Sequence, residues 1–200
     1  DQISGTETIH YQNNSPDSLP YLWMFLEQNL CAPTSITNVL DQPPLKFLDS
    51  AFDFSCQGFA GGLTLDYIRV MGHDAAHAVY GTTMRVDLAA PLAPGASIDL
   101  QAAWSFKVPG QGGGRMGHDG PLYEIAQWYP RMAVYDDVHG WNHEPYIGAG
   151  EFYLEYGDFD VSLTVPFSYI VRATGELRNP TTVLTPTEIA RLALARNSDT

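Results

Sequence analysis

The stretch MRVDLAAPLAPGASIDLQAAWSFKV, residues 84–108, contains two segments of strand length and composition joined by a turn. Residues 84–92 and residues 97–108 are rich in the aliphatic and aromatic side chains that strands favour. The segment PLAPGA between them has the Pro and Gly residues typical of a turn. Extended segments that follow one another through turns of this kind predict an all-β arrangement.

Segments of the same kind flank this stretch on both sides. TETIHY at residues 6–11 alternates with period two and ends at the turn signal NNSPDS. We expect connections at residues 30–62 and at the glycine-rich residues 109–121. The other predicted strands are residues 20–29, 63–71, 122–129, 150–156, 158–166 and 169–177. The chain is therefore predicted to be mainly β, an antiparallel saddle-shaped sheet or sandwich.

Only the end of the chain carries helix signals. Thr185 can serve as the N-cap, Pro186 as the first helical residue and Glu188 as the third residue of a capping box. The sequence predicts one short helix over residues 185–196, with Arg196 near its C-terminal end.

Length and charge limit the classes of partner. Two hundred residues fit a single domain, and the formal net charge is −13. Such an acidic surface repels phosphate backbones and anionic lipid, so neither nucleic acid nor a membrane is an expected partner. No apolar run reaches the length of about 18 residues that a membrane-spanning helix needs.

Cys31 and Cys56 are compatible with one disulfide or with two buried thiols. We favour the disulfide, because both cysteines flank a segment that looks like a loop. A disulfide and an acidic surface fit an exported protein, periplasmic or extracellular.

HDAAH at residues 73–77 is one methylene short of the zinc-peptidase motif H-E-x-x-H. The Asp74 carboxylate falls about one carbon–carbon bond short of a zinc-bound water, and the flanking residues favour strand over helix. On a strand, side chains four residues apart lie about 13 Å from each other, too far to share one metal ion. We predict a polar turn between strands here.

HGWNH, with His139 and His143, has the same spacing without a neighbouring acid and reads as a loop. A stand-alone metal-binding protein, using either histidine pair, remains an alternative. No motif selects a nucleophile with its base, so the chain itself carries no predicted catalytic site.

Large aromatic side chains gather in residues 127–142, around Arg131 and two aspartates. Such a cluster is typical of a ligand pocket or of a surface between domains. It is equally typical of a corner of the hydrophobic core that contains an ion pair. One alternative function follows from it. A carbohydrate-binding module would stack sugars on Trp128, Trp141 and tyrosines that are exposed and coplanar.

The chain resembles the N-terminal β domain of aminopeptidase N-like zinc metallopeptidases in two blocks that follow the family's order. The first block is SGTETIHYQNNSPDSLPYLWMFLEQN, residues 4–29. The second covers residues 123–180 and begins YEIAQWYPRMAVYDDVHGWN. The second block is similar to the form seen in a bacterial subgroup. The resemblance implies a non-catalytic domain, residues 1–200, clipped at both ends. Residues 185–196 would lead to a helical catalytic domain outside this chain, which binds the zinc ion. The implied partners are that catalytic domain and a peptide substrate.

The family's β domain lends one segment to the active site, of the form Q-x-E-P. Gln127 and Pro130 match its first and last residues, and Tyr129 stands in place of the Glu. The resemblance therefore implies that Gln127 and Tyr129 line the pocket for the substrate's N-terminus and first side chain. A phenol carries no full negative charge at neutral pH, so the substitution changes how an amine can be recognised.

Overall fold

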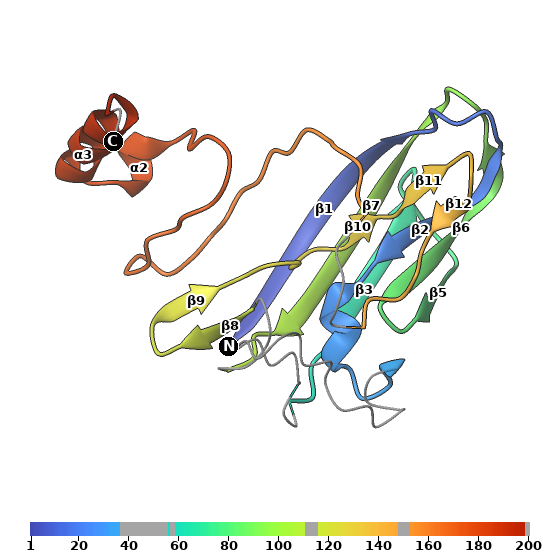
Figure 1. Ribbon diagram of the computed structural model, residues 1–200, viewed down its shortest axis with the longest axis horizontal. Helices are drawn as coiled ribbons and strands as arrows, with labels where there is room; N and C mark the ends of the chain where they lie inside the picture. The colour runs from blue at the N-terminus through green and yellow to red at the C-terminus, as the bar shows by residue number, and fades with distance from the viewer. Residues whose placement is uncertain (37–55, 57–58, 111–115, 148–152, 199–200) are drawn as a thin grey trace. The chain divides into compact units, whose positions relative to one another are not determined.

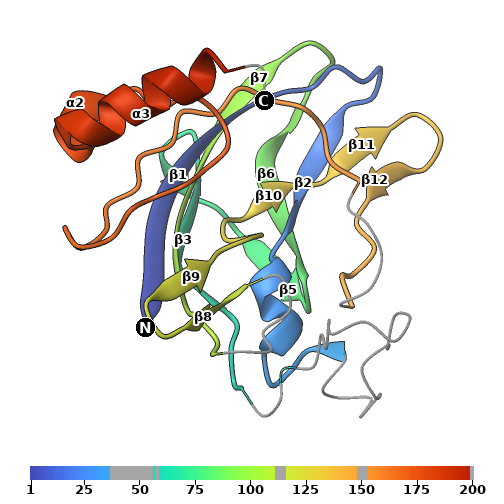
Figure 2. The same ribbon diagram turned by 60° about the vertical axis from the view of Figure 1, so that its left-hand side comes forward.

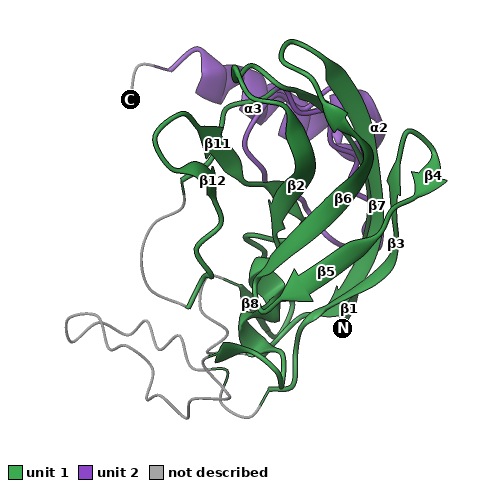
Figure 3. Cartoon of the chain, turned by 90° about the vertical axis from the view of Figure 1, so that its right-hand side faces the viewer, with its two compact units in different colours: residues 1–157 green, residues 158–200 purple. Residues whose placement is uncertain are grey.

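The computed structural model describes residues 1–36, 56, 59–110, 116–147 and 153–198 (Figure 1). It divides into two compact units, Asp1–Gly157 and Asp158–Thr200 (Figure 3). The described part is mainly β and its strand pairs are antiparallel, which confirms the predicted fold class.

The first large sheet has the strand order β1-β7-β3-β4. These strands are β1 (Gln2–Gln12), β7 (Ser97–Lys107), β3 (Leu63–Val70) and β4 (His73–Asp74). Strand β1 pairs with β7 along its whole length, from Gln2 opposite Lys107 to Gln12 opposite Ser97. Its side chains alternate strictly between exposed and half-buried, as the period-two pattern of residues 6–11 predicts.

The second large sheet has the order β10-β2-β6-β5. Its strands are β10 (Arg131–Met132), β2 (Leu19–Phe25), β6 (Thr83–Leu92) and β5 (His77–Tyr80). After β2 the chain enters the short 3₁₀ helix η1 (Glu27–Cys31). Two small hairpins complete the unit, β8 (Gly117–Asp119) with β9 (Leu122–Glu124), and β11 (Val134–Asp136) with β12 (Gly140–Asn142).

The core lies between the two large sheets, whose inward faces supply one continuous cluster (Figure 2). The two predicted strands of residues 84–108 face each other across this core, because the turn at Gly95 carries the chain from β6 in one sheet to β7 in the other. The buried apolar side chains of the cluster include Leu22, Met24, Ile68, Met84, Val86, Leu100, Trp104 and Phe106.

The strands predicted towards the C-terminus are wrong. Described residues 153–179 contain no strand, although Phe159, Val161 and Leu163 alternate as expected. A period-two pattern shows only that successive side chains point to opposite sides of an extended backbone. A strand also needs a neighbouring strand for its N–H and C=O groups, and the apolar side chains of this segment other than Leu154 are exposed. The strand predicted over residues 122–129 is also shorter, because β9 ends at Glu124.

The predicted C-terminal helix is confirmed as α3 (Pro186–Arg196). Glu188 N donates to Thr185 Oγ1 over 3.3 Å, and Thr185 N donates to Glu188 Oε2 over 2.8 Å, which completes the capping box. A four-residue helix, α2 (Pro180–Val183), precedes it and is not predicted by the sequence. None of the helices in the described ranges is long and apolar enough to cross a membrane.

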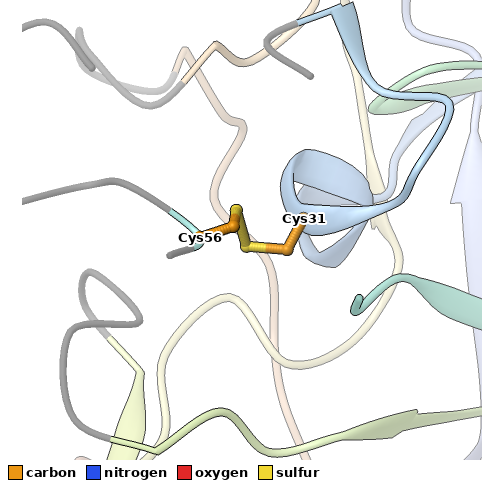
Figure 4. Close-up of a disulfide and its surroundings, with 2 residues drawn as sticks. All are labelled: Cys31 and Cys56. Atoms are coloured by element: carbon orange, nitrogen blue, oxygen red, sulfur yellow. A yellow bond between two sulfur atoms is a disulfide. The ribbon is translucent and has the colours of Figure 1, made fainter. Parts of the chain in front are cut away.

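The disulfide is formed between Cys31, the last residue of η1, and Cys56 (Figure 4). It closes a loop with a sequence separation of 25 residues. Gly61 N also donates to Cys31 O over 2.9 Å, so the end of η1 is tied to the chain that leads into β3.

Replacing both Cys31 and Cys56 by alanine is expected to lower the free energy of unfolding by about 3 kcal/mol, because an open loop gains conformational freedom in the unfolded state. Urea denaturation of the two oxidised proteins measures the difference. Reduction should shift the wild-type midpoint by a similar amount and leave the variant unchanged. Equal midpoints for oxidised and reduced wild type would contradict the expectation.

Candidate functional site around Tyr129

The segment that joins β9 to β10 has an unusual backbone at Gln127, whose φ is +46°. A left-handed conformation costs a residue with a side chain roughly 1–2 kcal/mol and persists only where its surroundings fix it. The fixing contacts are visible, since Gln28 Nε2 donates to Gln127 O over 2.7 Å and Pro130 is fully buried. The backbone around Tyr129 is therefore held in one conformation.

A series of aromatic rings supports Tyr129. Its ring meets Trp128 edge-on at a centroid distance of 4.8 Å and 71°, and Trp128 packs on Trp104 at 5.7 Å. Trp104 is 1% exposed and faces Gly5 of the neighbouring strand. A Cβ atom at Gly5 would lie 2.5 Å from Trp104 Cζ2, so the indole needs a glycine on β1.

A buried ion pair lies beside these rings. Arg131 faces Phe25 in the β10–β2 register, and Glu27 follows Phe25 by two residues, so Arg131 Nη2 donates to Glu27 Oε1. The two side chains are 15% and 1% exposed. The other carboxylate oxygen, Glu27 Oε2, is buried without a hydrogen-bond partner. Burial raises the pKa of Glu27, while the hydrogen bond and charge of Arg131 act in the opposite direction.

A second buried carboxyl group comes from β1. Glu7 lies on the same face of the strand as Gly5, and its Oε1 atom is buried without a hydrogen-bond partner. Burial raises the pKa of Glu7 to about 8. The pKa of Tyr129 is raised by burial, lowered by Arg131 and raised by Glu7 and Glu27. We call Tyr129, together with the three charged residues that act on its pKa, Glu7, Glu27 and Arg131, the Tyr129 cluster.

The raised pKa of Glu7 has a consequence for stability. The folded protein keeps a proton up to about pH 8 that the unfolded chain releases near 4.5, so stability falls as the pH rises through this window. Between about pH 6 and about pH 9, wild type should lose about 2 kcal/mol more than Glu7→Gln, a figure reduced for partial solvent screening. Urea denaturation at several pH values measures this. Parallel pH profiles for the two proteins would contradict the assignment.

The two residues that the resemblance implies as substrate contacts, Gln127 and Tyr129, lie in different surroundings. Tyr129 lies within the cluster, and Gln127 precedes it with a half-buried side chain. The sequence singles out Arg131 beside the aromatic residues, with aspartates as its nearest acids, but its partner in the structure is Glu27, 104 residues away. Neither Glu27 nor Glu7 is predicted from the sequence. One sequence signal for Glu7 exists. In the alternating pattern of β1, this acid lies on the same face as the apolar Ile9, which indicates a buried carboxyl group.

The two histidines of HDAAH lie on different sheets. His73 lies on β4 of the first large sheet and His77 on β5 of the second, both exposed, and Asp74 pairs with Arg69 at 2.8 Å. HDAAH forms no helix, and the predicted turn is limited to Ala75 and Ala76, because His73 and Asp74 belong to β4 and His77 begins β5. His143 packs on Trp23 at a centroid distance of 4.2 Å. Where the chain is described, no group of three or more His, Cys, Asp or Glu side chains could hold a metal ion.

The two tryptophans of the proposed sugar platform have other partners. Trp128 and Trp141 are half-buried, and Trp141 meets Tyr135 edge-on at 5.3 Å and 76°. Tyr135 is itself held by a hydrogen bond from its hydroxyl to Asp17 Oδ2, at 2.7 Å. A stacking platform needs exposed and coplanar rings, so this geometry does not favour the carbohydrate-binding alternative.

No protein family, curated protein or solved structure matches this chain in comparisons with known proteins.

Proposed function

We propose that this chain is the non-catalytic N-terminal domain of a zinc-dependent aminopeptidase. It docks on the peptidase's own catalytic domain and lines the pocket that receives the N-terminus and first side chain of a peptide substrate. The observation that carries the proposal is the fixed segment of Gln127 and Tyr129, which resembles the family's substrate-contacting motif Q-x-E-P at Gln127 and Pro130 and has charged side chains acting on Tyr129.

Zinc belongs to the catalytic domain in this proposal. The part of this chain is to bind and orient the substrate. A substrate contact that is equally strong before and during the reaction acts on KM and leaves kcat nearly unchanged.

Two substitutions in the full-length peptidase test the proposal. Tyr129→Phe removes one hydroxyl and Gln127→Ala one amide, while the supporting aromatic packing remains. Each is expected to raise KM for an aminoacyl-4-nitroanilide about 10-fold, the effect of one lost hydrogen bond to a charged group. The matched control is Tyr156→Phe, since Tyr156 is fully exposed and should leave KM unchanged. Unchanged KM values in both site variants would refute the proposed role.

We also infer export to an oxidising compartment, periplasmic or extracellular. The Cys31–Cys56 disulfide supports this inference, because structural disulfides persist mainly outside the reducing cytosol. Recovery of the protein from the producing cells with both cysteines reduced would contradict it.

A further inference from the structure

We propose that Met71 is a site of reversible, stereoselective oxidation to methionine sulfoxide by peroxide. One face of its sulfur accepts a hydrogen bond from the backbone, so the oxygen adds to the other face and forms mainly one of the two sulfoxide epimers. The inference is independent of the proposed function, because it concerns the turn between β3 and β4 and not the segment around Tyr129.

Exposure distinguishes Met71 from the other four methionines of the chain. The side chain of Met71 is 61% exposed, whereas Met24 and Met84 are 0% exposed and Met116 is 5% exposed. Met132, on β10, is half-buried. A thioether is oxidised only where the oxidant can reach the sulfur, so dissolved peroxide should react with Met71 first.

The backbone of the turn fixes the position of this side chain. β3 ends at Val70 and β4 begins at His73, and these two residues are paired, so Met71 and Gly72 form a two-residue turn. Their φ angles are +50° and +80°, and a type I′ hairpin turn requires positive φ at both positions. Such a conformation is unfavourable for a residue with a side chain and persists only where contacts hold it.

Two hydrogen bonds to Asp99 of β7 hold Met71 in this conformation. Met71 N donates to Asp99 O over 2.8 Å, which extends the β3–β7 ladder by one residue. In a regular antiparallel pair, Asp99 N would donate back to Met71 O. It donates instead to Met71 Sδ over 3.4 Å, so the sulfur replaces a carbonyl oxygen at the end of the ladder. One lone pair of the sulfur is therefore engaged.

The second lone pair of the sulfur is the one that reacts. It attacks one oxygen of hydrogen peroxide, so an S–O bond forms while the O–O bond breaks. The sulfur is oxidised by two electrons and the peroxide is reduced. The departing hydroxide takes up the proton of the transferred oxygen and leaves as water. Because the new oxygen points away from Asp99 N, the ladder does not have to open.

The two lone pairs give different products, because the sulfur of a methionine sulfoxide is a stereocentre. Attack through the bonded lone pair must first break the hydrogen bond from Asp99 N, which should slow this route about 5-fold. Each epimer is reduced by its own methionine sulfoxide reductase. A site that forms mainly one epimer is therefore restored mainly by one enzyme.

The test exposes the folded chain to hydrogen peroxide, removes the oxidant and digests the protein with trypsin. The peptide of residues 70–85 contains both Met71 and Met84, so mass spectrometry compares an exposed and a buried methionine in one fragment. Met71 should be oxidised at least about 10-fold faster than Met84. One of the two reductases, A or B, should then restore about 5-fold more Met71 in this peptide than the other.

The same chain oxidised in urea is the control, because unfolding removes both the burial of Met84 and the hydrogen bond from Asp99 N. Met71 and Met84 should then react at similar rates and give nearly equal amounts of the two epimers. Equal restoration of the folded-state product by both reductases would overturn the inference. Oxidation of Met84 as fast as Met71 in the folded protein would overturn it as well.

Discussion

Replacing Trp104 by alanine is expected to lower the free energy of unfolding by about 4 kcal/mol, the typical cost of removing a large aromatic side chain from a core. Trp104 is 1% exposed, stacks on Phe106 at a centroid distance of 5.8 Å and supports Trp128 at 5.7 Å. The alanine leaves a cavity between the two large sheets that the strands, fixed by their ladders, cannot fill.

Urea denaturation followed by circular dichroism measures this loss. Trp141→Ala is the matched control, since Trp141 is half-buried at the β11–β12 hairpin and should cost clearly less. A loss below about 1 kcal/mol for Trp104→Ala would mean that this indole is not part of the core.

Replacing Glu27 by alanine is expected to destabilise the protein by about 3 kcal/mol, because it leaves the buried guanidinium of Arg131 without its counter-ion. The ion pair as a whole contributes less to the free energy of unfolding than the cost of removing Glu27 alone suggests. The double variant Glu27→Leu/Arg131→Met removes both charges and should recover most of the loss, since apolar groups of similar size can replace a buried pair.

Urea denaturation of the single and double variants shows whether the loss comes from the uncompensated charge or from the ion pair itself. Glu124→Ala serves as the control, because Glu124 is exposed and should change stability by less than about 0.5 kcal/mol. A double variant less stable than Glu27→Ala would show that the pair itself, and not the uncompensated charge, dominates.

Much of the sandwich could be predicted because alternation and turn residues are local signals. TETIHY, the segments around residues 84–108 and the capping box at Thr185 all fold as expected. Strand partners are not local. The same alternation predicts strands over residues 158–166 and 169–177, where the described chain forms no strand. The sequence likewise does not reveal that β6 and β7 belong to opposite sheets.

The candidate site shows the same limit. A short segment that resembles a family motif points to Tyr129, and Arg131 stands out beside it, but neither Glu7 nor Glu27 is predicted. Arg131 meets Glu27 only because β10 pairs with β2 beside Phe25. The position of Glu7 on the apolar face of a strand predicts a buried acid, but the sequence does not show which side chains surround this acid.

The most direct test compares peptide hydrolysis by this chain with hydrolysis by the product of the full reading frame that encodes it. Aminoacyl-4-nitroanilides are the substrates, with zinc and with a chelator. We expect the chain alone to be inactive under both conditions. The full product should contain H-E-x-x-H with a downstream Glu and be active until the chelator removes its zinc. Chelator-sensitive activity in the chain alone, or a full product without that motif, would contradict the account.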